Sequence, residues 1–132
     1  MNFDNFKPVN LAVGFPSVSI TTNGVTFSKA AIVKVRMPEY VLLMINETDK
    51  QLAIIESEKD AENATPFVRN KKSPSVRYNN KDFLYTLEKL MGWDLTQQGY
   101  KAMGEYYSDE NALVFNLRSA TPITGRESEG DE

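Results

Sequence analysis

Hydrophobic and polar positions follow the same order along two stretches of the chain. The pattern over residues 17–57 predicts a strand, a short helix, a strand, a turn and a strand. Residues 75–118 predict the same series with a longer helix. The clearest match lies in the closing hairpins, where residues 45–54 align with residues 106–115. This pattern predicts two related β-α-β-β halves.

The first half opens with a hairpin signal followed by a helix signal. Apolar and polar side chains alternate over residues 17–27, around the pair Asn23-Gly24. Both residues of this pair accept a positive φ, so they predict a tight hairpin turn. Ser28 is expected to cap a helix over residues 29–36, because its hydroxyl can accept an unpaired backbone N–H.

The middle of the chain combines a strongly apolar segment with a polar one. Residues 40–45 are almost all apolar, which predicts a strand buried on both faces. Residues 56–74 are polar and contain two prolines, so we interpret them as a connector between the halves. Phe67 and Val68 are expected to fasten this connector to the core.

The second half contains an amphipathic helix. Its apolar positions fall on one helical face: Phe83, Leu84, Leu87, Leu90 and Met91. Asn79 or Asn80 is suited to cap its start. Gly92 is suited to end it, because glycine readily adopts the left-handed conformation.

These elements predict an α+β fold with two main helices. The two related β-α-β-β halves are expected to form one mixed or antiparallel sheet or a small barrel. We expect a single globular domain over residues 1–120, with halves at 17–57 and 75–118 and the connector at 56–74. Residues 121–132 form an acidic tail that lacks apolar side chains from residue 124 on, and we expect it to be disordered.

Composition limits the classes of protein to which the chain can belong. The 132-residue chain is 41% hydrophobic and 25% charged, an ordinary globular balance, and it contains no cysteine and no histidine. A disulfide scaffold is therefore excluded, and the commonest general base and metal ligand are missing. No apolar run approaches the ~20 residues of a membrane span. We expect a cytoplasmic protein with no cofactor, no metal and no membrane contact.

The sequence gives little support for catalysis. No phosphate-binding glycine loop or nucleophile motif is present. The acidic pair Asp109-Glu110 lies in an expected hairpin turn, where such residues stabilise the turn itself. We therefore predict that the protein is not an enzyme. A pair of carboxylates brought together by folding stays open as the least favoured alternative.

Basic residues supply the candidate binding site. The formal net charge is −3, yet Lys and Arg gather in two places. The candidate DNA-binding residues are Lys29, Lys34 and Arg36 at the first helix, and Arg69, Lys71, Lys72, Arg77 and Lys81 around the connector and the second half. Neutralising phosphates with such cations is the main source of nucleic-acid affinity. The alternative is that they keep the surface soluble, which the acidic composition of the chain favours.

Part of the first half resembles a known family. The segment VSITTNGVTFSKAAI at residues 18–32 resembles the opening of the AbrB/SpoVT/MazE-like swapped-hairpin family. Residues 38–41 resemble the loop that follows, and residues 51–55 resemble the closing strand. Two such halves in one chain are similar to MraZ-type proteins. Most members are DNA-binding transcription factors and antitoxins. The resemblance implies that Lys29, Lys34 and Arg36 face DNA.

Two functions follow as expectations. The first is a DNA-binding transcriptional regulator of the AbrB/MraZ-like type. The alternative is a non-enzymatic protein-interaction module, such as an adaptor or an antitoxin-like protein, with an exposed apolar or tyrosine-rich patch. The expected partners are accordingly DNA, a second copy of the chain or another protein.

Overall fold

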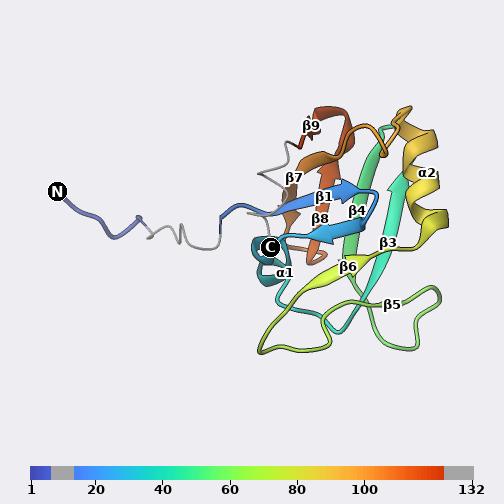
Figure 1. Cartoon of the computed structure of the whole chain (residues 1–132). Coiled ribbons are helices and arrows are strands. Elements are labelled where there is room, and N and C mark those ends of the chain that lie inside the picture. The colour runs from blue at the N-terminus through green and yellow to red at the C-terminus, as the bar shows by residue number, and fades with distance from the viewer. Residues whose placement is uncertain (7–13, 124–132) are drawn as a thin grey trace.

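The computed structural model describes residues 1–6 and 14–123, and its fold is α+β (Figure 1). The strands are β1 (Ser17–Thr21), β2 (Gly24–Phe27), β3 (Tyr40–Asn46), β4 (Gln51–Glu56), β5 (Thr65–Pro66), β6 (Val76–Tyr78), β7 (Tyr100–Tyr107), β8 (Ala112–Asn116) and β9 (Thr121–Pro122). The helices are α1 (Lys29–Lys34), α2 (Lys81–Met91) and the short 3-10 helix η1 (Leu117–Ser119). None of these helices is long and apolar enough to cross a membrane.

The strands form one antiparallel sheet that curls into a half-barrel. Their order is β5-β3-β4-β8-β7-β1-β2-β6, and β9 pairs with the beginning of β7. The β3–β4 and β7–β8 hairpins lie side by side, because β4 pairs with β8. The β1–β2 hairpin then joins the sheet through β7. Of the alternatives predicted from the sequence, the antiparallel sheet is therefore the one observed.

The two predicted halves differ in the elements that precede their closing hairpins. The first has the β1–β2 hairpin and a helix of six residues, whereas the second has the three-residue β6 and a helix of eleven residues. The structure does not confirm the internal repeat, which stays a prediction.

Helix α1 begins where it was predicted to begin but ends early. The Ser28 hydroxyl accepts a hydrogen bond from the Ala31 backbone N–H at 3.1 Å, as expected for a cap. The helix was predicted to continue to residue 36, yet it ends at Lys34. Arg36 and Met37 have φ angles of 66° and 50°, so the chain leaves the helical conformation there.

Helix α2 agrees with its predicted caps. The Asn80 side-chain oxygen accepts from the Phe83 backbone N–H at 3.0 Å, and Gly92 closes the helix with a φ of 71°. The helix lies along the inner side of the curled sheet, where Leu84 and Leu87 are buried (Figure 1). The amphipathic pattern thus identified the correct face of this helix.

Aromatic side chains fill the centre of the core. The Phe27 ring lies 5.6 Å from that of Phe67 and 5.7 Å from that of Phe115, centroid to centroid. Phe67 and its neighbour Val68 are each 3% exposed, which confirms that they fasten the connector to the core. The Phe67 backbone N–H also donates to the Glu39 carbonyl at 2.8 Å.

Strand β3 was predicted to be buried on both faces, and this prediction is wrong. Val41, Leu43 and Ile45 belong to the core or pack against it, but Met44 is 45% exposed. The reason is that both helices bury their side chains in the core on the inner side of the sheet. In the part of the chain that the structure describes, no helix covers the outer side of β3.

The end of the described chain extends the sheet. Residues 121–122 were assigned to the acidic tail, but they form β9, in which Pro122 is opposite Tyr100. The Ile123 backbone N–H also donates to the Gly99 carbonyl at 2.9 Å. The remainder of the predicted tail, 124–132, lies outside the described residues.

Candidate nucleic-acid interface

The connector borders three adjoining hollows in the surface. The first has a volume of about 380 Å³, the second about 640 Å³ and the third about 310 Å³. Arg69 lines both the first and the second hollow, and Ser73 lines both the second and the third. The hollows therefore form a continuous, uneven surface along residues 65–77.

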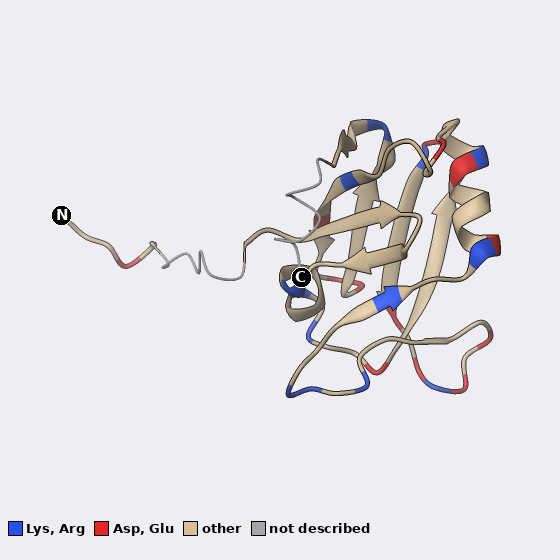
Figure 2. Cartoon of the chain, viewed as in Figure 1, with Lys and Arg blue, Asp and Glu red and all other residues tan. Residues whose placement is uncertain are grey.

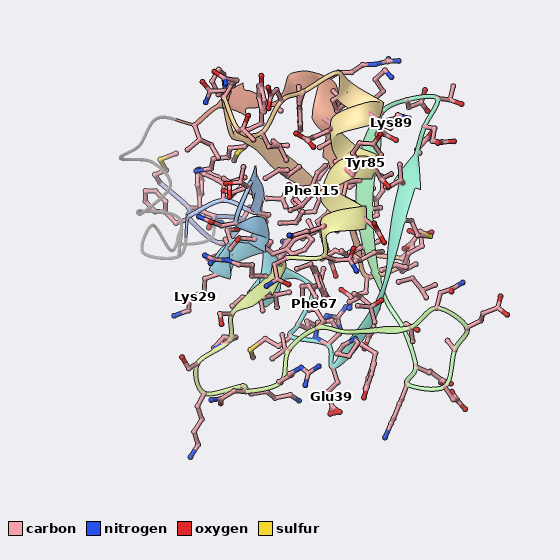
Figure 3. All side chains as sticks on the ribbon, turned by 45° about the vertical axis from the view of Figure 1, so that its right-hand side comes forward. Lys29, Glu39, Phe67, Tyr85, Lys89 and Phe115 are labelled. Atoms are coloured by element: carbon pink, nitrogen blue, oxygen red, sulfur yellow. The ribbon has the colours of Figure 1, made fainter. Side chains whose placement is uncertain are left out.

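Five of the eight predicted basic residues line these hollows. They are Lys29, Arg69, Lys71, Lys72 and Arg77, and we call them the basic surface. All five side chains are exposed. Figure 2 shows basic residues at the tip of the connector, on β6 and on α1. Lys29 extends from the start of α1 on the same side as the connector tip (Figure 3).

The connector holds its cations outward because its apolar residues and its turn are fixed. The Val68 backbone N–H donates to the Pro38 carbonyl at 3.0 Å, so the chain is anchored directly before Arg69. The Asn70 side-chain oxygen then accepts from the Lys72 backbone N–H at 3.0 Å. Asparagine stabilises such turns by this local bond. Lys71 and Lys72 are thereby presented in a defined turn.

Strand β6 places Arg77 beside the connector. The Arg77 Nε donates to the Thr26 hydroxyl at 3.1 Å, across the β2–β6 pair. The Tyr78 hydroxyl donates to the Pro66 carbonyl at 2.6 Å. Burial raises the pKa of Tyr78 above its ordinary value, and this outweighs the opposite effect of the Arg69 charge. The Tyr78 hydroxyl therefore remains a donor at alkaline pH, where an ordinary tyrosine ionises.

Acidic residues border the basic surface. Glu39 lines the first hollow together with Arg69 and Lys71. Glu58, Asp60 and Glu62 precede β5 in the 57–64 loop, which Figure 2 shows on the opposite side of the lower part of the molecule from the basic tip of the connector. The basic surface is therefore a limited patch.

Lys34 and Arg36 do not line the hollows and contact Tyr106 instead. The Lys34 Nζ lies 4.9 Å from the centroid of the Tyr106 ring. A hydrogen bond to the Tyr106 hydroxyl raises the pKa of Arg36 above its ordinary value. Lys81, the first residue of α2, lines none of the three hollows either. The structure thus gathers five predicted site residues and leaves three outside.

Asn111 has a structural role that its sequence context did not show. It is the last residue of the β7–β8 turn, yet it is 8% exposed and connects three elements. Its Nδ2 donates to the Val35 carbonyl and to the Glu56 Oε1, each at 2.9 Å, and its Oδ1 accepts from the Tyr106 hydroxyl at 2.7 Å. This network holds Tyr106 between the β7–β8 turn and the end of α1. The sequence shows only an asparagine in an expected turn, and this alone does not indicate the hydrogen-bond network.

The described residues provide no evident site for a metal. Residues 1–6 and 14–123 contain no group of three or more carboxylates placed to hold an ion. Every buried side-chain nitrogen or oxygen within these ranges has a hydrogen-bond partner. The exposed cations are consequently the clearest chemical feature of the site.

Comparison of the chain with protein-family models, with curated proteins and with solved structures gives no match.

Proposed function

We propose that this protein binds DNA through the basic surface. The observation that carries the proposal is the convergence of five exposed cations, from α1, the connector and β6, on three adjoining hollows. Lys and Arg that contact phosphates release counterions from the nucleic acid. A surface of this kind recognises the sugar-phosphate backbone rather than the edges of the bases.

The resemblance of residues 18–32 to the AbrB-like family extends this proposal to transcriptional regulation. The resemblance implied contacts from Lys29, Lys34 and Arg36, whereas only Lys29 belongs to the basic surface. We therefore assign the principal DNA contacts to the connector and β6, and Lys29 continues this surface onto α1. Lys34 and Arg36 stabilise the packing around Tyr106 instead.

A salt titration tests the proposal. Fluorescence anisotropy of a labelled duplex DNA is measured with the full chain at increasing salt. If all five cations neutralise phosphates, the slope of log K against log salt reaches about −4 to −5. The double variant Lys71→Gln and Lys72→Gln is expected to make this slope less steep by about 2.

Its matched control is the double variant Lys34→Gln and Lys81→Gln. It removes the same formal charge at positions outside the hollows, and it should change the slope by much less. Equal effects of the two double variants would assign binding to net charge rather than to the basic surface. Absence of binding at low salt would overturn the proposal.

A second function, protein interaction, is favoured by a different observation. Met44, Met103 and Tyr107 are 45%, 54% and 44% exposed, although all three lie within strands. Exposed apolar side chains that gather on one face of a soluble protein mark sites of association. A pull-down with the full chain as bait tests this function, and capture should be lost in the variant Met44→Glu.

A further inference from the structure

The outer side of strands β3, β4, β8 and β7 carries two apolar rows. In the first row, Leu42 is opposite Ile55, Ile55 opposite Ala112, and Ala112 opposite Tyr107. Successive side chains of a strand point to opposite faces. Because Val41, Leu113 and Tyr106 belong to the core or pack against it, their neighbours in this row point outward. Of these, Tyr107 is 44% exposed, whereas the small side chain of Ala112 is buried between its neighbours, at 7%.

The second row runs beside the first. Met44 is opposite Ala53, Ala53 opposite Val114, and Val114 opposite Glu105. Only Glu105 is charged in this row. We call the two rows together the outer face. It is apolar across four adjacent strands, whereas an antiparallel sheet that faces water normally has a polar outer side.

Within the described residues, no helix lies on the outer face. Helix α1 buries Ala31 and Ile32, and α2 buries Leu84 and Leu87, all in the core on the inner side. No described helix therefore packs on the outer face. Apolar patches on soluble proteins mark candidate sites of association.

The N-terminal arm, residues 1–15, offers a complementary apolar segment. Phe3, Phe6 and Phe15 are 63%, 61% and 69% exposed. The sequence between them continues with apolar residues at alternate positions, namely Val9, Leu11 and Val13, which is the pattern of a strand with one apolar side. The chain therefore contains a face with exposed apolar side chains, Met44 and Tyr107, and an arm whose described aromatic side chains are exposed as well.

The arm is attached beside the outer face and is long enough to cross it. The Pro16 carbonyl accepts from the Gly104 backbone N–H at 2.9 Å, next to Met103 and Glu105 of β7. Four strands span roughly 19 Å at a spacing of about 4.8 Å. Fifteen extended residues reach about 50 Å. The arm is therefore long enough to contact the outer face of a neighbouring molecule.

We propose that the arm of one copy binds the outer face of a second copy, in a reciprocal exchange. The surface areas favour this arrangement over direct packing of two outer faces. Each face consists of two rows about 6.8 Å apart that cross four strands, so its area is only roughly 270 Å². A stable interface needs about 800 Å² on each partner, which the face alone does not supply.

The base of the arm favours exchange over binding within one chain. Phe15 is 69% exposed although it directly precedes Pro16 at the border of the outer face. Phe15, the residue at the base of the arm, is therefore not buried against its own domain. In a reciprocal exchange, the arm of each copy binds the outer face of the other copy, which gives a closed, symmetric dimer.

Light scattering after size-exclusion chromatography tests the exchange. The full chain at about 100 μM is expected to be a dimer, well above a dissociation constant in the micromolar range. A chain without residues 1–14 has an intact face and no arm, and the variant Met44→Glu has an intact arm and a charged face. Each of these two proteins should be a monomer on its own.

Mixing the two proteins distinguishes the possible arrangements. The arm of Met44→Glu should bind the intact face of the shortened chain, so an equimolar mixture should form a heterodimer that is weaker than the full-chain dimer, because it has one of the two arm–face contacts. A shortened chain that still dimerises would show that two faces pack directly and would overturn the proposal. A full chain that is monomeric at this concentration would also overturn it.

Two controls keep this test independent of folding and of DNA. Thermal melting monitors the fold of each variant, and Tyr107→Glu offers a second way to charge the outer face if Met44→Glu unfolds. The double variant Lys71→Gln and Lys72→Gln should remain a dimer. The exchange rests on the protein-interaction function proposed above. The outcome of its test does not depend on whether the protein binds DNA.

Discussion

The β3–β4 and β7–β8 hairpins hold a helix in the same way but with different chemistry. The last residue of each turn, Lys50 or Asn111, has a left-handed backbone, with a φ of 56° or 51°. Each side chain then donates to a carbonyl at the C-terminal end of a helix. The Lys50 Nζ reaches Leu90 of α2 at 2.9 Å, and the Asn111 Nδ2 reaches Val35 after α1 at 2.9 Å.

The difference between the two contacts lies in burial. Asn111 is buried and satisfies three neighbouring groups, so its removal leaves polar atoms without partners away from water. Lys50 is only partly buried, and water can replace its contact. Equivalent positions in two hairpins can therefore differ several-fold in their contribution to stability. The correspondence also agrees with the predicted internal repeat, which itself stays a prediction.

Replacing Asn111 should give the largest effect. Asn111→Leu removes the partners of Val35, Glu56 and Tyr106 and places a branched side chain at a positive φ. We expect a loss of about 3 kcal/mol in the free energy of unfolding. Urea titration followed by Trp93 fluorescence measures it. A loss below about 1 kcal/mol would show that the buried network contributes little.

Gly104→Ala should have the next largest effect, and it tests another difference between the hairpins. Gly104 is opposite Phe115, where the β3–β4 hairpin has Leu43 opposite Ile54. A Cβ on Gly104 would lie 2.7 Å from a carbon of the Phe115 ring, which is fully buried. We expect a loss of about 2 kcal/mol from this overpacking.

The same urea titration measures this loss, with Met103→Ala as the matched control. Met103 precedes Gly104 on the same strand but is 54% exposed. Its truncation should change stability much less. Wild-type stability of Gly104→Ala would mean that the Phe115 ring has room to move, so that the β7–β8 hairpin packs no more tightly than its neighbour.

Lys50→Met should give the smallest effect. It removes the contact with the Leu90 carbonyl and a favourable charge at the C-terminal end of α2. We expect a loss of about 0.5 kcal/mol, which should shrink as salt is added. Thermal melting at low and high salt measures it, and Lys59→Met in an exposed loop serves as the control. A loss as large as that of Asn111→Leu would abolish the contrast between the two hairpins.

Local signals in the sequence predicted the elements well. Asn80 and Gly92 mark the ends of α2, and their side-chain oxygen and backbone freedom act within a few residues. The end of α1 was missed because Arg36 and Met37 adopt positive φ angles without being glycine. The position of Asn111 beneath Val35 depends on the packing of distant segments, and no local pattern shows it.

The candidate site was predictable only where its residues are close in sequence. Arg69, Lys71 and Lys72 belong to one connector, and the structure keeps them together. Lys34 and Arg36 were predicted from their charge and from the family resemblance, but the fold places Tyr106 against both. The apolar run over residues 40–45 likewise predicted two covered faces, since a sequence does not show which side of a strand a helix will cover.

The two ends of the curled sheet have a consequence for aggregation. Strands β5 and β6 contain two and three residues, and the Tyr78 hydroxyl of β6 bonds to the Pro66 carbonyl of β5. Short edges and an edge proline offer a poor template for the backbone of another chain. Addition of a further strand onto β5 or β6 is thereby disfavoured. The chain can then expose apolar side chains on the broad side of its sheet with less risk of polymerising through these two strands.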